Sequence, residues 1–402
     1  MSKQNYPTHN LVQTESLRIR SRSYSPKPLF IERMQELLPN EKDFNEYMEI
    51  LKKSPVNSIR CNNLKISVEE LKKRIEAKNW KIKQPFKDYP EIMIVEGKFA
   101  EATASDNYNK LVNKKLNEID NNSIKMVDKV KDYINNKKIF ANKNEQVIGV
   151  VDQISGGQLI SLAPGELGRA LEHILGYYYI QEISSMLPVL VLDPKPGEKV
   201  LDLCASPGSK TTQIAARMNN QGLIIANEVK LDRVKILSAN LERCGVMNVI
   251  LTRRDGIALC NKFEKEKIFF DKILVDAPCS GEGTIRSSPK TFEMWNIKTV
   301  EYLSKLQKAL ISSAIKILKP NGTLIYSTCT HSPEEDEEII DFALRNFKDI
   351  KIEKIELPVK MRKGITKWKE KEYIEDVKLS CRIYPQDNNT EGFFLAKIRR
   401  LK

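Results

Sequence analysis

The stretch VLDLCASPGSKTTQIA, from Val200 to Ala215, constrains the fold most strongly. It begins as a short apolar run, passes through small residues, and resumes with apolar residues at helical spacing, which predicts a buried strand leading into a helix. In open α/β sheets such a turn forms one wall of the ligand crevice, and Gly208 allows close backbone approach. The stretch contains neither G-x-G-x-x-G nor G-x-x-x-x-G-K-[ST], so it is neither a dinucleotide fingerprint nor a P-loop. An ordinary strand-to-helix turn is the alternative.

Strand and helix patterns alternate after this stretch. Further strands are predicted at 223–227, 248–252, 270–276 and 323–327, with helices at 231–244, 299–318 and 333–347. Another helix is predicted at 172–192, and a final hairpin pairs 380–384 with 392–398. The alternation predicts an α/β fold, in which a parallel sheet has helices on both faces and ends in an antiparallel C-terminal hairpin.

The length of 402 residues exceeds what one compact core holds, so several domains are expected. Residues 1–28 are polar and basic and predict a flexible arm. Residues 29–97 predict a small α/β domain whose lysine-rich surface holds the substrate. Residues 98–162 are rich in Asn and Lys and predict a low-complexity insert, whereas residues 163–402 carry the alternating pattern of the catalytic domain.

The formal charge of +13 and a pI near 9.2 suit a polyanionic partner, either nucleic acid or an anionic membrane surface. No apolar run reaches transmembrane length, and the first residues lack the layout of a signal peptide, so a cytoplasmic protein is expected. Seven cysteines without a C-x-x-C pair and only three histidines argue against a zinc site. Free thiols and no metal are therefore expected.

Acidic residues fall at the carboxyl ends of successive predicted strands: Asp202, Glu228, Asp255 and Asp276. A carboxylate after the second strand can accept hydrogen bonds from ribose hydroxyls, which makes Glu228 the ribose candidate. Asp255 is placed to accept from an adenine amino group. The set indicates a nucleotide-binding edge of the sheet.

Two cysteines follow core strands. Cys279 lies in DAPCSGEGT after the fourth strand, and Cys329 lies in STCT after the fifth. Both strand ends open onto the crevice beside the Ser206 to Lys210 loop, so two thiols and a carboxylate can converge on one substrate atom. The alternative is that both cysteines are small packed residues.

A thiol beside a nucleotide-binding loop suits one chemistry in particular. Carbon 5 of a pyrimidine is too poor a nucleophile to accept a methyl group, but a thiolate that adds to carbon 6 activates it. A carboxylate at the ring N3 edge assists by holding a proton, and a second thiol can assist product release. The base must be unstacked to enter such a crevice.

The motifs DLCASPGSKTTQ, DAPCSGEGT and YSTCT, in this order and spacing, strongly resemble the Nol/Nop/Sun family of RNA cytosine-5 methyltransferases, which use S-adenosylmethionine. The resemblance covers roughly Leu171 to the C-terminus and implies a Rossmann-like methyltransferase sheet. It implies cofactor contacts from Cys204, Ala205, Ser206, Pro207, Gly208, Ser209, Lys210, Glu228, Asp255 and Asp276. It also implies that Cys329 attacks the base, that Cys279 and Asp276 assist, and that Arg286 meets an RNA phosphate.

Relatives of this compact, basic type act on tRNA, near the variable loop and T-stem, so tRNA is the expected partner of a monomeric enzyme. Ribosomal RNA is the alternative substrate. A non-catalytic RNA-binding assembly factor is the alternative of another class, although an idle site has no need of two thiols. Some relatives carry a PUA domain where the 98–162 insert stands, but its glycine and proline pattern is absent here.

His331 is the histidine nearest to Cys329 in the sequence and is a candidate general base. The following Ser332-Pro333-Glu334-Glu335 resembles a capped helix start, which would turn His331 outward instead. That helix start could itself lower the pKa of the thiol.

Overall fold

The computed structural model describes residues 25–99 and 159–402. This part of the chain divides into two units. The large unit contains the described residues up to Leu71 together with residues 83–95 and 167–402. The small unit contains residues 72–82 and the described part of 96–166. The predicted arm at 1–28 and insert at 98–162 lie almost entirely outside the described residues, and the predicted domain boundaries stay predictions.

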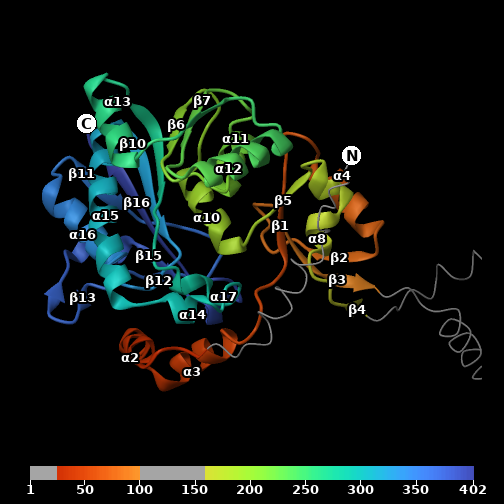
Figure 1. Ribbon diagram of the computed structural model, residues 1–402, viewed down its shortest axis with the longest axis horizontal. Coiled ribbons are helices and arrows are strands. Elements are labelled where there is room, and N and C mark those ends of the chain that lie inside the picture. Colours follow the sequence, from red (N-terminus) through yellow and green to blue (C-terminus); the bar gives the residue numbers. More distant parts are fainter. Residues whose placement is uncertain (1–24, 100–158) are drawn as a thin grey trace, which may run out of the picture. The chain divides into compact units, whose positions relative to one another are not determined.

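A nine-stranded sheet runs through the large unit (Figure 1). Its parallel strands are β6 (Lys199–Asp202), β7 (Leu223–Asn227), β8 (Val249–Thr252), β9 (Phe270–Asp276) and β10 (Leu318–Thr328). They stand in the order β10-β9-β6-β7-β8. The antiparallel part consists of β11 (Ile350–Glu353), β12 (Arg362–Lys363), β15 (Cys381–Ile383) and β16 (Phe393–Arg400). β16 lies between β10 and β15, which confirms the predicted C-terminal hairpin.

Helices cover both faces of this sheet (Figure 1). One face carries α10 (Ile183–Leu192), α11 (Ser209–Arg217) and α12 (Leu231–Cys244), and the other carries α13 (Gly256–Lys265), α15 (Ile297–Lys316) and α16 (Glu337–Asn346). Leu201 and Val275 point into the core beneath α15, whereas Val200 and Leu274 point into the core beneath α10. Successive side chains of a strand face opposite ways, so these continuous apolar runs supply both cores. The predicted α/β fold is confirmed.

The N-terminal helices α2 (Pro28–Leu37) and α3 (Glu41–Ile50) also belong to the large unit. Phe30 packs edge-on against Phe292 and Trp295, with ring centroids 5.4 and 5.5 Å away. The strand β1 (Ser58–Cys61) pairs with β5 (Tyr178–Ile180) and with the first residues of β3 (Ile92–Phe99). In the small unit, the last residues of β3 pair with β4 (Leu159–Ile160).

Among the described residues, the remaining elements are α4 (Val68–Glu76), β2 (Trp80–Lys83), α8 (Glu166–Arg169), α9 (Leu171–Ile174), η1 (Glu282–Thr284), α14 (Thr291–Met294), β13 (Lys367–Trp368), β14 (Lys371–Glu372), η2 (Glu375–Leu379) and α17 (Pro385–Asn388). None of the helices described is both long and apolar enough to span a bilayer.

Two predicted helices are wrong in extent. The helix expected at 172–192 is interrupted, because β5 separates α9 from α10 and pairs with β1. Its Tyr-Tyr-Ile sequence favours a strand. The helix expected at 333–347 begins only at Glu337, since the preceding residues form a turn.

Candidate active site

The carboxyl ends of the parallel strands meet at one edge of the sheet. Along the order β10-β9-β6-β7-β8, this edge carries Cys329 after β10, Asp276 on β9, Asp202 on β6, Glu228 after β7 and Asp255 after β8. The strand order therefore brings together acidic groups and a thiol that are far apart in the sequence.

A pocket of about 280 Å³ opens at this edge. Much of its wall comes from the segment that was predicted to bind a cofactor, which is the loop after β6 and the start of α11: Cys204, Ala205, Ser206, Pro207, Ser209 and Lys210. Asp202 and Asp276 also line the pocket. The structure thus places the predicted cofactor loop and both acids around one cavity.

The loop is held against α12. Gly208 adopts a φ of 103°, and a Cβ there would lie 3.0 Å from the Leu237 side chain. The Ser206 hydroxyl donates to the carbonyl of Arg233 at 3.0 Å, and the Arg233 guanidinium donates to the carbonyl of Ser206 at 2.7 Å. Because a positive φ suits glycine, this turn needs Gly208 for its conformation as well as for space.

Asp202 lines the pocket and carries a buried acceptor oxygen without a hydrogen-bond partner in the described chain. Its Oδ2 accepts a hydrogen bond from Thr211 Oγ1 at 2.7 Å, while Oδ1 is buried and has no partner within the described chain. Burial raises the pKa of this carboxyl to about 7. A buried acceptor without a partner is costly, so the pocket suits a ligand that donates hydrogen bonds.

Asp276 and Lys210 form an ion pair on the same wall. Lys210 Nζ lies 2.7 Å from Asp276 Oδ2 and donates to Ser185 Oγ at 2.9 Å. Asp276 Oδ1 accepts from Ser327 Oγ at 2.7 Å. These contacts fix the Asp276 carboxylate at the end of β9, between the pocket and the loop with Cys279.

The two candidate cysteines are in contact. The Sγ atoms of Cys279 and Cys329 lie 3.3 Å apart, and the backbone N–H of Cys329 also donates to Cys279 Sγ at 3.3 Å. Both residues are partly exposed, whereas Cys61, Cys244, Cys260 and Cys381 are buried. The hydrogen bond with Cys329 and burial raise the pKa of Cys279 well above its ordinary value, so this thiol keeps its proton. The ends of two strands thus bring together two thiols that lie fifty residues apart in the sequence.

Glu228 and Asp255 lie further along the sheet edge, outside the residues that line this pocket. Glu228 is buried, lies 3.3 Å from Arg233 Nη1, and accepts from the backbone of Lys230 at 2.9 Å. Asp255 is exposed and caps α13 by accepting from the backbone of Ala258 at 2.9 Å. Their ribose and adenine contacts stay predictions.

Arg286 is not available to an RNA phosphate, contrary to the prediction. Its side chain is only 4% exposed, and its guanidinium donates to the carbonyls of Lys53, Ser54 and Thr390 and to Asn389 Oδ1 at 2.7 to 3.0 Å. All three guanidinium nitrogens donate hydrogen bonds to groups inside the protein. Arg286 therefore joins three chain segments.

His331 does not turn outward, and its surroundings do not suit a general base. The ring is buried and stacks on Tyr384, with centroids 4.8 Å apart and an interplanar angle of 8°. Burial, with the charges of Arg382 and Arg362, lowers its pKa to about 3. The imidazole therefore stays neutral and packs between the helices and the sheet.

Residues from β5, from α10 and from the connection between them also line the pocket, and sequence reasoning missed them: Tyr179, Ile180, Gln181, Glu182 and Ser185. Two guanidinium groups lie over the Tyr179 ring, that of Arg60 at 5.6 Å and that of Arg243 at 5.4 Å from the ring centroid. The aromatic run at 177–179 could have indicated a strand here.

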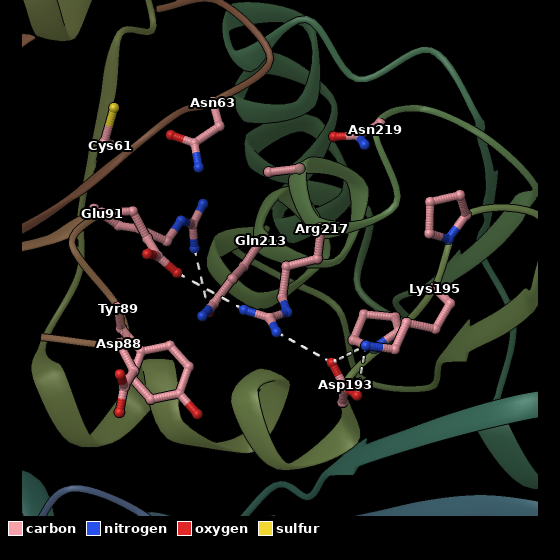
Figure 2. Close-up of a pocket in the computed structure, with 14 residues that line it drawn as sticks. Cys61, Asn63, Asp88, Tyr89, Glu91, Asp193, Lys195, Gln213, Arg217 and Asn219 are labelled. Carbon is pink, nitrogen blue, oxygen red and sulfur yellow. Dashed lines mark hydrogen bonds and ion pairs between the residues drawn. The ribbon is translucent and has the colours of Figure 1, made fainter. Parts of the chain in front are cut away.

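A second, larger pocket of about 470 Å³ lies beside the C-terminal half of α11 (Figure 2). Figure 2 shows Arg217 directed toward both Glu91 and Asp193. The Arg217 guanidinium lies 3.8 Å from Glu91 Oε1 and 3.1 Å from Asp193 Oδ1. Lys195 also pairs with Asp193. The charges in this pocket largely neutralise one another. Within residues 25–99 and 159–402, no cluster of His, Cys, Asp and Glu side chains has metal-binding geometry.

Comparison with known proteins gives consistent results. Residues 189–399 match the family described as 16S rRNA methyltransferase RsmB/F. The tRNA (cytosine(49)-C(5))-methyltransferase of Pyrococcus abyssi is 49% identical over 233 residues, which cover 58% of this chain and 73% of that protein. Ribosomal RNA small subunit methyltransferase F of Vibrio campbellii is 35% identical over 375 residues, 92% of this chain. The chain spans 63% of the length of the Vibrio protein.

Two solved structures from Pyrococcus horikoshii are similar over nearly the whole chain. A methyltransferase homolog protein is 29% identical, with a TM-score of 0.67, covering 98% of this chain and all of its own. NSun6 is 27% identical, with a TM-score of 0.66, covering 92% of this chain and 97% of its own.

Proposed function

The chain belongs to the 16S rRNA methyltransferase RsmB/F family, the RNA cytosine-5 methyltransferases that its motifs resemble, and we propose that it methylates carbon 5 of a cytosine in tRNA. S-adenosylmethionine supplies the methyl group when bound. One observation carries the proposal: the Sγ atoms of Cys279 and Cys329 lie 3.3 Å apart at the sheet edge that also carries Asp276.

The proposed roles of the two thiols differ. Cys329 adds through Sγ to carbon 6 of the cytosine, which makes carbon 5 nucleophilic. After methylation, the carbon 5 proton passes to water and its bonding electrons form the double bond between carbon 5 and carbon 6. The bond between Sγ and carbon 6 breaks, which restores the ring and frees Cys329. We assign Cys279 to this second step, because its raised pKa keeps it protonated and its Sγ lies 3.3 Å from that of Cys329, so that it can donate a proton to the sulfur that leaves carbon 6. Asp276 holds the N3 edge of the base.

The pocket beside these thiols fits the proposed cofactor. Asp202 and Asp276 line it, and Asp202 Oδ1 is a buried acceptor without a partner in the described chain, which suits the cationic, hydrogen-bond-donating methionine end of S-adenosylmethionine. The loop from Cys204 to Lys210 would enclose the methionine part. Glu228 and Asp255, further along the edge, would meet the ribose and the adenine.

The substrate proposal rests on the relatives. Over alignments of similar length, identity is 49% over 233 residues to the tRNA enzyme and 44% over 237 residues to ribosomal RNA small subunit methyltransferase F of Vibrio vulnificus. Cytosine 49 is therefore the first tRNA position to test. Ribosomal RNA is the second candidate, because the Vibrio relative aligns over 92% of this chain.

Transfer from radiolabelled S-adenosylmethionine to unmodified tRNA and to 16S rRNA transcripts tests the proposal. Wild type should label tRNA, and changing cytosine 49 to uracil should remove the label. Cys329→Ala should abolish transfer, whereas Cys279→Ala should accumulate a covalent protein-RNA species that survives a denaturing gel. Cys260→Ala, which removes a buried thiol on α13, serves as the control.

Two results would refute parts of the proposal. Equal loss of activity in both thiol variants, without trapped RNA, would contradict the assigned roles. Labelling of 16S rRNA but not of tRNA would replace the proposed substrate with the second candidate.

A further inference from the structure

We propose that Glu282 and Glu335 are positioning residues that fix the two thiols in position relative to each other, an inference that rests on the proposed function. Cys279 lies in the first thiol loop, residues 277–284, and Cys329 lies in the second thiol loop, residues 329–336. Each of the two glutamates belongs to one loop and accepts hydrogen bonds from the other. Together they form a reciprocal clamp.

Glu282 reaches from the first thiol loop to the second. Its Oε2 accepts from the backbone N–H of His331 at 3.1 Å, and its Oε1 accepts from Ser332 Oγ at 2.6 Å. Oε1 also accepts from Trp295 Nε1, which anchors the carboxylate to the segment after α14. The side chain is 2% exposed, so both oxygens depend on these donors.

Glu335 reaches in the opposite direction. Its Oε2 accepts from the backbone N–H of Ser280, the residue after Cys279, at 3.1 Å. The same oxygen accepts from Gln307 Nε2 at 2.8 Å, and Gln307 also donates to the carbonyl of Pro278 on the other side of Cys279. Glu335 is fully buried. The backbone on both sides of Cys279 is thereby tied to the second thiol loop and to α15.

The clamp acts where positional precision matters most. Besides the contacts of the two cysteines with each other, Gly283 N donates to Cys329 O at 2.9 Å, and Ser280 Oγ lies 2.8 Å from Thr330 Oγ1. Misplacing a reacting group by about 1 Å can cost about 100-fold in rate. Buried carboxylates are costly, and here both of them bond across to the loop that carries the opposite thiol.

The substitutions follow from these contacts. Glu282→Gln turns an acceptor oxygen into an amide donor that faces other donors, and Glu335→Met fills similar volume without any acceptor. Glu335→Gln keeps one carbonyl acceptor and is the conservative variant expected to rescue. Glu334→Gln is the matched control, because this neighbouring carboxylate pairs with Arg33 at 2.6 Å and accepts from Trp368 instead.

The first measurement needs no RNA. Diamide, an azo oxidant that takes up the two thiol hydrogens, should join Cys279 and Cys329 rapidly in the wild type, as followed by mass spectrometry. The rate should fall at least about 10-fold in Glu282→Gln and Glu335→Met, but not in Glu335→Gln or Glu334→Gln. Circular dichroism selects a temperature at which every variant is folded. Wild-type rates in both clamp variants would overturn the inference.

The second measurement separates binding from chemistry. In methyl transfer, Glu282→Gln and Glu335→Met should lower kcat about 10- to 100-fold and change the KM for RNA less than about twofold. An unchanged kcat in folded clamp variants, with Cys329→Ala inactive, would refute the clamp and leave the proposed function standing. Retained transfer by Cys329→Ala would refute the proposed function, while the diamide result would still decide the clamp.

Discussion

Replacing Arg286 with Met should lower the stability of the protein and leave its affinity for RNA unchanged. The guanidinium of Arg286 is buried and donates to the carbonyls of Lys53, Ser54 and Thr390 and to Asn389 Oδ1. Met preserves much of the side-chain volume but offers no donor, so four acceptors lose their partner.

The magnitude follows from these contacts. A hydrogen bond that involves a charged group contributes about 1.5–3 kcal/mol, but bonds within one network are not additive. A buried acceptor left without a partner costs about 1–3 kcal/mol, so with four acceptors in one non-additive network we expect a loss of about 3–5 kcal/mol. Urea unfolding of wild type and Arg286→Met, with equal slopes, gives the difference in the free energy of unfolding.

The RNA arm of the experiment measures how affinity depends on salt. Each lost phosphate contact reduces the slope of log K against log salt by about 0.7–0.9. We expect the same slope for wild type and Arg286→Met at a temperature where both are folded. Arg345→Met, which removes a largely exposed arginine, is the control for the change in net charge. A slope reduced by about 0.7–0.9, the change expected for one phosphate contact, at unchanged stability, would refute the structural role of Arg286 and support the predicted phosphate contact.

Two further predictions concern the thiol loops. Burial raises the folded pKa of Glu335 from its ordinary 4.5 to about 8, so between these pH values the folded protein binds one more proton than the unfolded chain. From pH 5 to 8, wild type should therefore lose stability relative to Glu335→Gln by up to about 1.4 kcal/mol per pH unit, as measured by urea unfolding. Parallel curves of stability against pH for the two proteins would contradict this. In Gly283→Ala, the new Cβ would lie 2.3 Å from the carbonyl oxygen of Gly392, so thermal unfolding should show a free energy of unfolding lower by about 1–3 kcal/mol. Gly168→Ala, where the space is open, should show no such loss.

The features that were predicted best from the sequence are those determined by residues close together in the chain. The strands 223–227 and 270–276 were placed correctly, because a continuous apolar run ends there at a turn or an acidic residue. The convergence of Cys279 and Cys329 also followed from local information, since parallel strands end at one edge of their sheet.

Contacts between distant segments could not be predicted in this way. Arg286 is occupied by carbonyls more than a hundred residues away in the chain, and His331 is buried by Tyr384 and the start of β16. Nothing adjacent to either residue reveals these partners. Likewise Glu282 looks like a solvated acid in a glycine-rich loop until His331 and Ser332 are brought against it. β5 is a different case, because its aromatic sequence favours a strand, although its pairing partner, β1, lies far upstream.

The position of β16 sets the order in which the site matures during synthesis. This strand pairs along β10 from Thr323 to Thr328, and the backbone N–H of Gly392, just before it, donates to the carbonyl of Gly283 in the first thiol loop. Ribosomes deliver a chain from its N-terminus, so both thiols emerge before the strand that braces them. The hydrogen bond from Gly392 to the first thiol loop therefore forms only after both thiols have been synthesised.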